Sequence, residues 1–280
     1  MVVRVLFIKL GNIGSSPMLE YCIDERADRE DLDVRVVTSG SKLSPEDAAD
    51  LMKLAAQISP QIVVVVSPNA TLPGPMTVAK EFAGKDIPTI FITDKPGSKA
   101  TESLEKMGHG YLVVSADSMI GARREFLDPT EMALFNAEMV GVLSATGVYA
   151  FLTQEIEKVI AGVKENRKPT LPRVKINSEL ATEGFFTNPY ARCKAIAALE
   201  IAEQVAKITT RACFVEKDRD TYTTLCSSAH EMLSAALELS REAREIEKAG
   251  DHLLRQPHMS DGSLGRKSRL LEKPVKRSSG

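Results

Sequence analysis

VVRVLFIKLGNIGSSP, at residues 2–17, shows in one segment how the first half of the chain is built. The apolar run at residues 2–8 is followed by a glycine turn and then by Ser16-Pro17, a pair typical of a helix start. The run is almost continuously apolar rather than alternating, as expected for a parallel strand that is covered on both faces. The segment therefore predicts a buried strand, a tight turn and a helix.

The same order of strand and helix recurs through the first half of the chain. Further short β-branched runs predict strands at residues 33–38, 62–67, 89–93 and 111–114. Helical patterns lie between the strands, near residues 18–26, 45–57, 76–82 and 98–107. This alternation predicts an α/β protein with a Rossmann-like, mostly parallel sheet and helices on both faces.

The second half of the chain is predominantly helical in pattern. Helical spacing runs from residue 129 to about 163, and again over residues 189–207 and 222–248. A connector at residues 168–178 holds two prolines and one possible short strand, 173–176. We expect an α/β domain with the ligand loops at residues 1–125, a helical bundle layer at 126–254 and a small basic C-terminal segment at 255–280.

Composition narrows the possible partners and the compartment. The chain has 36 basic and 38 acidic residues, and its net charge of -2 gives no reason to expect nucleic acid or a membrane surface as a partner. The four cysteines form no CxxC pair and have no histidine at ligand spacing, so no metal site is indicated. Reduced thiols in a cytoplasm fit this pattern best. No window approaches the roughly 20 apolar residues of a membrane span.

The turn after the first strand is a candidate anion site. The segment from Lys9 through Asn12, Gly14 and Ser15 ends at a helix start, where free N–H groups and the helix dipole attract negative charge. Its pattern is GxxG rather than GxGxxG, and the second strand ends in Thr38-Ser39-Gly40 without the acid that would hold an NAD ribose. This weakens a nicotinamide-dinucleotide interpretation. A turn that binds nothing is the alternative.

A second candidate loop follows the third strand. Residues 67–75 read SPNATLPGP, and three prolines with one glycine make a stiff loop of preset shape. If the first and third strands are neighbours, this loop lies beside the first one, and two rigid loops suit a flat ring system. The alternative is a loop that only turns the chain.

The third candidate region is MIGARREFLDPTEMALFN, residues 119–136, after the last predicted strand of the first half. Arg123 and Arg124 could clamp a phosphate or a carboxylate. Asp128 and Glu131 are acids in the same run, but Asp128-Pro129 is also typical of a capped helix start with Glu131 at the third position of a capping box. No histidine accompanies a nucleophile as in a triad, and His230 fits a core or interface position at least as well as an active one.

These motifs also carry a resemblance to a known family. The runs at residues 119–136, 8–17 (IKLGNIGSSP) and 67–75, with NPYARCKAIA at 188–197 and AHEM at 229–232, resemble those of the archaeal coenzyme F420-dependent methylenetetrahydromethanopterin dehydrogenases. The resemblance spans nearly the whole chain, and residues 119–136 form a long and compositionally unusual match.

The resemblance implies an oxidoreductase of methanogenesis from carbon dioxide. Its reaction is reversible hydride transfer between 5,10-methylenetetrahydromethanopterin and coenzyme F420, an 8-hydroxy-5-deazaflavin that acts as a cosubstrate, with no metal. The products are the methenyl cation and the reduced coenzyme. Such a reaction needs orientation and charge complementarity more than proton shuttles, which agrees with the lack of an obvious nucleophile or general base.

The resemblance also suggests roles for the candidate residues. A carboxylate of Asp128 or Glu131 would stabilise the forming cation electrostatically. The ligand-binding candidates, which would contact the pterin or the coenzyme or neutralise its anionic tail, are Lys9, Asn12, Gly14, Ser15, Pro68, Asn69, Gly74, Arg123 and Arg124. The family is built of homo-oligomers, a hexamer arranged as a trimer of dimers. The alternatives are an NADP-type Rossmann dehydrogenase and a non-catalytic α/β binding module.

Overall fold

A computed structural model of the chain describes residues 1–13, 16–116 and 128–277. Its centre is a parallel sheet with the strand order β2-β1-β3-β4-β5-β6. The strands are β1 (Val3–Lys9), β2 (Leu32–Thr38), β3 (Ile62–Ser67), β4 (Thr89–Asp94), β5 (Gly110–Val114) and β6 (Arg173–Ile176). The predicted α/β class and its strands are confirmed, and the short strand expected in the connector is the sixth member of the sheet.

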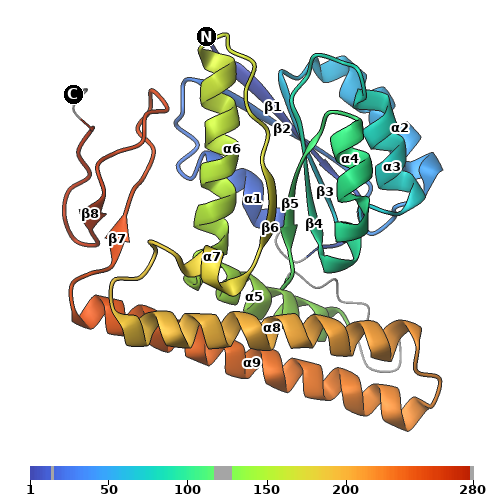
Figure 1. The fold of residues 1–280 in the computed structure, drawn as a ribbon, viewed down its shortest axis with the longest axis vertical. Coiled ribbons are helices and arrows are strands. Elements are labelled where there is room, and N and C mark those ends of the chain that lie inside the picture. The colour runs from blue at the N-terminus through green and yellow to red at the C-terminus, as the bar shows by residue number, and fades with distance from the viewer. Residues whose placement is uncertain (14–15, 117–127, 278–280) are drawn as a thin grey trace.

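Helices cover both faces of the sheet (Figure 1). One face carries α2 (Pro45–Ile58), α3 (Pro73–Phe82) and α4 (Thr101–Lys106), which follows the 3-10 helix η1 (Lys95–Ala100). The other face carries α1 (Ser16–Ile23) and α6 (Val148–Lys164). Alternate side chains of β1 go to the two faces: Leu6 and Ile8 pack under α2 and α3, whereas Val5 and Phe7 pack with the core on the side of α1 and α6.

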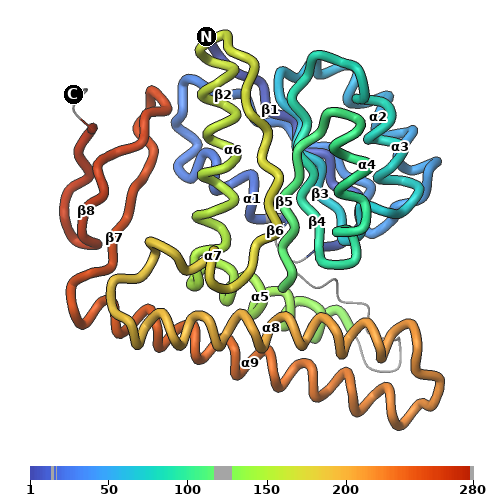
Figure 2. The backbone as a smooth tube through the Cα atoms, in the orientation of Figure 1, coloured from blue at the N-terminus to red at the C-terminus, as the bar shows by residue number. Residues whose placement is uncertain are grey.

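A helical layer lies beyond the end of the sheet at which the strands finish, which we call the carboxyl edge. It contains α5 (Pro129–Ala145), the short α7 (Ser178–Thr182) and a long hairpin of α8 (Pro189–Phe214) and α9 (Arg219–Ala249). Figure 2 shows the hairpin running across this end of the molecule. The helical bundle layer predicted from the sequence is therefore confirmed.

The helical pattern expected from residue 129 to about 163 is two helices, not one. α5 ends at Ala145 and α6 begins at Val148, with a bend of 68° between them. Gly147 lies in the turn with φ 96°, and a Cβ there would come 2.3 Å from the carbonyl oxygen of Ala181. A glycine was needed for both reasons, because its backbone adopts positive φ readily and leaves room for α7.

Two predicted helix boundaries also need correction. The loop predicted over residues 67–75 ends at Leu72, because Pro73 takes the first helical position of α3 and places Gly74 in the first turn. Ser16, predicted as a cap, is itself the first residue of α1, and its hydroxyl is buried without a hydrogen-bond partner among the described residues. The caps at Ser44 and Asn188 are confirmed: Ser44 accepts from Asp47 N, and Asn188 from Tyr190 N.

The basic C-terminal segment is folded along one side of the molecule. It contains the strand pair β7 (Leu254–Arg255) and β8 (Ser268–Arg269) and runs beside α6 (Figure 1). The division of the chain into domains at residues 125 and 254 stays a prediction.

No single helix among residues 1–13, 16–116 and 128–277 is long and apolar enough to cross a bilayer. Only α5 and α6 taken together meet that length and composition, and both contribute buried side chains to the core.

Candidate functional site

The candidate site lies at the carboxyl edge of the sheet, where β1 pairs with both β2 and β3. The chain leaves β1 toward β2 on one side and later returns to β3 on the other, so the loops after β1 and β3 diverge around a crevice. In open parallel sheets ligands bind at such a switch point. The two loops singled out in the sequence are therefore neighbours, as predicted.

Close backbone packing joins the two loops. Leu10 N donates to Val66 O at 2.9 Å. Gly11 has φ 78°, and a Cβ there would lie 2.6 Å from Leu43 Cδ2 and 3.2 Å from Pro68 Cδ. Gly11 is therefore required by space as well as by its backbone conformation. Pro68 is buried against it, which makes this predicted ligand residue also a packing residue.

Lys9 ends β1 and faces the loop after β2. Its Nζ donates to Asn12 Oδ1 at 3.2 Å and to Gly40 O at 3.3 Å. Among the described residues no carboxylate lies within ion-pair distance of this ammonium group, although Glu20 acts on it from further away. Burial lowers the pKa of Lys9, and Glu20 partly opposes that effect. A half-buried cation held only by neutral oxygens would gain from an anionic ligand.

Asn69 shapes the loop after β3. Its Oδ1 accepts from Thr71 N at 3.0 Å and from Thr71 Oγ1 at 2.6 Å, an Asx-type turn. The next residue, Ala70, donates its N–H to Thr93 Oγ1 at 3.1 Å, which ties this loop to the end of β4. Because the Asn69 oxygen is used in the turn, its amide NH2 group is the part suited to a ligand.

Gly74, in the first turn of α3, is packed against the loop after β2. A Cβ on it would lie 2.2 Å from Leu43 O and 2.8 Å from Ser44 O. A side chain there would displace backbone, so Gly74 fixes how α3 meets the start of α2. The loops after β1, β2, β3 and β4 thus form one interlocked edge.

Two buried hydroxyls lie at the same edge. Ser67 is the last residue of β3 and Ser16 the first of α1, and the Oγ of each has no hydrogen-bond partner among the described residues. A buried hydroxyl without a partner costs free energy, roughly 1–3 kcal/mol. Hydroxyls of this kind suit a polar ligand that supplies the missing bonds.

The start of α5 places the two acidic candidates. Asp128 is exposed and accepts from Glu131 N at 2.8 Å, so the predicted cap is confirmed. The side chain of Glu131 instead faces α9, where its Oε2 lies 3.7 Å from Nδ1 of His230. His230 packs on Phe135 with ring centroids 4.6 Å apart, and burial lowers its pKa although Glu131 and Glu138 act in the opposite direction. His230 is thus an interface residue of α5 and α9 that favours the neutral form.

Some predicted site residues lie outside the described part of the chain. These are Gly14, Ser15, Arg123 and Arg124. The described residues before and after them, Ile13, Ser16, Ala116 and Asp128, all belong to the carboxyl edge or the start of α5.

Sequence reasoning missed the contribution of α8 to this edge. Lys95, the first residue after β4, forms an ion pair with Glu203 of α8, and Lys207 lies 3.3 Å from the same carboxylate. Hydrogen bonds from Lys95 and Lys207 lower the pKa of Glu203 although burial opposes them. The position of Lys95 at the end of a predicted strand could have indicated it, but no local signal marks Glu203.

Comparisons with known proteins agree over almost the whole chain. The family model described as methylene-5,6,7,8-tetrahydromethanopterin dehydrogenase matches residues 3–275. An F420-dependent methylenetetrahydromethanopterin dehydrogenase of Archaeoglobus fulgidus is 52% identical over 98% of this chain and 100% of that protein. One from Methanothermobacter marburgensis is 47% identical with the same coverage. A solved dehydrogenase in complex with methylene-tetrahydromethanopterin and coenzyme F420 superposes with a TM-score of 0.93 at 42% identity, over 98% of this chain and 100% of that one.

Proposed function

The chain belongs to the methylene-5,6,7,8-tetrahydromethanopterin dehydrogenase family, and from this premise we propose how its residues serve the family's reaction. It is an oxidoreductase that transfers a hydride reversibly between 5,10-methylenetetrahydromethanopterin and coenzyme F420, a one-carbon step of methanogenesis. The observation that carries this function is the match of the entire fold to a dehydrogenase solved with both compounds.

The described residues of the carboxyl edge fit a bound deazaflavin. Lys9 has no carboxylate at ion-pair distance among them, so its ammonium can pair with an anionic group of the coenzyme. Ser67 and Ser16 provide buried hydroxyls, and Asn69 keeps its amide donors. Bound coenzyme F420 would supply the ring that takes up or gives back the hydride.

Rigid placement is the main task that we assign to the edge. A Cβ added at Gly74 would collide with the backbone of Leu43, and one added at Gly11 would press on the Leu43 side chain and lie tightly against Pro68. Loops interlocked in this way keep their shape when ligands arrive, so the free energy of binding is not spent on ordering them. Two ring systems held in fixed relation react as if their effective concentration were very high.

Charge complementarity is the second task. The methenyl product is a cation, and a carboxylate of Asp128 or Glu131 would stabilise it as it forms. Both acids lie in the first turn of α5 or at its cap, and His230 beside Glu131 favours the neutral form, so it does not cancel the carboxylate's charge. Arg123 and Arg124, with Gly14 and Ser15, remain proposed ligand residues on the basis of the family resemblance.

We also propose a homo-oligomer, a hexamer arranged as a trimer of dimers, in the cytoplasm. The support for an oligomer is the exposure of large apolar side chains at the end of α8, where Phe214 is 69% and Val215 68% exposed. Cysteines without a paired motif support a reducing compartment.

A spectrophotometric assay tests the function directly. Purified protein is mixed with methylenetetrahydromethanopterin and oxidised coenzyme F420, and the visible absorption band of the coenzyme is followed. We expect the band to bleach at a rate proportional to protein concentration, and reduced coenzyme with methenyl-pterin to reverse it. A stable band, together with saturable NADP binding, would replace this function with that of a nicotinamide-dependent dehydrogenase.

A further inference from the structure

The C-terminal segment at residues 253–276, which we call the strap, is held to the loop after α1 and to α6 by a cluster of charges, and Arg269 also pairs with Asp251 just after α9. It has little secondary structure of its own: the short β7–β8 pair and two isolated β-bridges, His258 with Leu264 and Gly265 with Lys276. What holds it against the loop after α1 and against α6 is a group of buried and partly exposed charges, which we call the latch. The latch residues are Glu25, Arg29, Asp31, Glu157, Lys164 and His258.

His258 is the strap's contribution to the latch. Only 5% of its side chain is exposed, and it lies between two carboxylates from different elements. Its backbone N donates to Glu25 Oε1 at 2.7 Å, and its Nδ1 lies 2.8 Å from Glu25 Oε2. Its Nε2 lies 3.2 Å from Oε1 of Glu157 on α6. The two ring nitrogens thus lie near carboxylates of two elements: Nδ1 is at hydrogen-bond distance from Glu25, and Nε2 is at ion-pair distance from Glu157 without a hydrogen bond among the described residues. This arrangement favours the charged imidazolium.

Permanent cations complete the latch. Arg29, whose side chain is 1% exposed, donates to Asp31 at 2.9 Å and to Glu157 at 2.5 Å. Lys164 donates to the same Asp31 at 2.7 Å. The latch therefore contains three carboxylates and two permanent cations, and its charges balance only when His258 carries a proton. A buried charge without a partner is costly, so the loss of this proton should destabilise the contact between the strap and the rest of the molecule.

The backbone of the strap is fitted closely to the latch. Gly262 has φ 77°, and a Cβ there would lie 2.0 Å from Asp31 Oδ2. Two residues earlier, Ser260 O accepts from Glu30 N at 2.7 Å. Residues 258–262 thus lie directly on the loop that carries Arg29 and Asp31.

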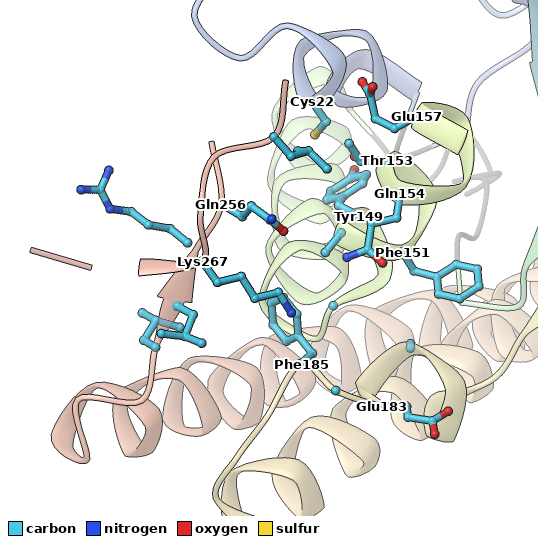
Figure 3. A pocket seen from close by; sticks show the side chains of 18 of the residues that line it. Cys22, Tyr149, Phe151, Thr153, Gln154, Glu157, Glu183, Phe185, Gln256 and Lys267 are labelled. Atoms are coloured by element: carbon cyan, nitrogen blue, oxygen red, sulfur yellow. The ribbon is translucent and has the colours of Figure 1, made fainter. Parts of the chain in front are cut away.

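The strap also lines one side of a partly open cavity. A space of about 390 Å³ lies between the strap and α6, and its volume is in the range of small-molecule sites. Figure 3 shows Tyr149, Thr153 and Gln154 of α6 on one side of it and Gln256 and Lys267 of the strap on the other. Glu25, Glu157 and His258 of the latch belong to its lining. The cavity is already partly open to solvent, and release of the strap would remove one of its walls.

We propose that the strap is a movable wall of the cavity, held in place by a proton-dependent latch in which protonated His258 lies between Glu25 and Glu157. When His258 loses its proton to solvent, three carboxylates face two cations and the strap is released.

The expected pH dependence follows from the neighbours of His258. Burial alone would lower the pKa of His258, and Arg29 acts in the same direction, but the carboxylates of Glu157 and Glu25 raise it to about 9. The hydrogen bond to His258 lowers the pKa of Glu25 although burial opposes it. Because the closed state binds the proton more tightly than the open state, the latch is fully effective below the ordinary histidine pKa and weakens as pH rises through about 9.

Limited digestion with trypsin measures the release, because the strap contains cleavage sites after Arg255, Arg266, Lys267 and Arg269. Cleavage at these sites is measured from pH 7.5 to 9.5 and divided, at each pH, by the cleavage of an unstructured peptide. We expect the normalised rate for the wild-type protein to rise about 20-fold over this range. This is the change expected when release is coupled to the loss of one proton whose pKa is about 9 in the closed state and the ordinary histidine value in the released state. Sites outside the strap should stay protected, which separates release from global unfolding.

Matched variants test whether the pH dependence of cleavage comes from the latch or whether packing alone holds the strap. His258→Gln should be cleaved rapidly at every pH, with a flat profile. His252→Gln changes an exposed histidine that lines the same cavity but does not belong to the latch, and it should follow the wild type. Glu25→Gln should move the midpoint to lower pH, and it tests the proposal if His258→Gln does not fold. A flat wild-type profile, or a His258→Gln or Glu25→Gln profile that matches the wild type, would overturn the proposal.

Discussion

The carboxyl edge of the sheet and the latch both contain half-buried or buried charges, but the charges have different kinds of partner in the two regions. In the latch, Arg29 has two carboxylate partners and Asp31 has two cations. At the carboxyl edge, the hydrogen-bond partners of Lys9 in the described part of the chain are the neutral oxygens of Asn12 and Gly40. The latch pairs its cations with carboxylates of the same chain, whereas no described carboxylate lies at ion-pair distance from Lys9, which can therefore pair with a ligand.

The difference gives a way to separate structural charge from functional charge. A charge that is paired inside the protein should affect stability when removed and should hardly affect substrate binding. A charge that meets only neutral groups should do the reverse. Substitutions of Arg29, Lys9 and Asp128 test this rule, and a substitution of Gly74 tests the rigidity of the edge.

The largest effect is expected for Arg29→Met, which removes the central cation of the latch. Asp31 and Glu157 would then lose their buried partner, and stability should fall by about 3–5 kcal/mol. Denaturant unfolding followed by circular dichroism measures the loss. Arg35→Met removes an exposed cation paired with Asp33 and should cost less than about 1 kcal/mol. Equal losses in the two variants would contradict the rule.

Gly74→Ala tests the interlocking of the edge rather than its charge. The added Cβ would collide with Leu43 O, and overpacking of this kind costs about 1–3 kcal/mol. Turnover should fall as well, since the first turn of α3 and the loop after β2 move together. Thermal unfolding and the F420 assay measure both effects, and Thr77→Ala, later in the same helix, is the control. If Gly74→Ala retained normal stability and turnover, the edge would be less rigid than we infer.

Lys9→Met should separate binding from stability at the edge. We expect the Michaelis constant for coenzyme F420 to rise about tenfold, equivalent to about 1.4 kcal/mol, with stability nearly unchanged. Steady-state kinetics at several coenzyme concentrations measures the change. Lys53→Met on α2, an exposed lysine paired with Asp50, should leave the Michaelis constant as it is. A Lys9 variant that loses stability but binds normally would assign Lys9 to the structure instead.

The smallest effects concern Asp128, where a cap and a charge coincide. Asp128→Ala should cost about 1 kcal/mol of stability because Glu131 N loses its acceptor. Asp128→Asn keeps a capping oxygen and should preserve stability, yet turnover should fall by roughly three- to tenfold if the carboxylate stabilises the forming cation. Full turnover in Asp128→Asn would restrict Asp128 to capping.

The sheet was predictable from sequence because its signals are local. Continuous β-branched runs such as residues 62–66 are typical of a doubly covered strand, and proline after Ser44, Asp128 or Asn188 marks a helix start. The adjacency of the two ligand loops could be anticipated from the parallel order. Gly147 was overlooked as a break because positive φ at one glycine has no signature in helical periodicity.

The latch and the contact between Lys95 and α8 could not be predicted, because both join residues that lie far apart in the sequence. Arg29 lies in a run of charges that resembles a solvated surface loop, yet it is buried against Glu157, 128 residues away. His258 meets Glu25 across 233 residues. Lys95 and Glu203 are likewise far apart in the chain. Only the folded chain shows that these charges are neighbours.

The position of β6 has a consequence for how the molecule is made. β5 ends at Val114, but its partner β6 begins only at Arg173, after α5 and α6. While the nascent chain leaves the ribosome, the edge of β5 therefore has unpaired backbone groups until α6 and β6 have been synthesised, and an open strand edge invites pairing with other chains. We infer that the first five strands are the aggregation-prone stage of biosynthesis, and that chains truncated before residue 173 will accumulate as insoluble material.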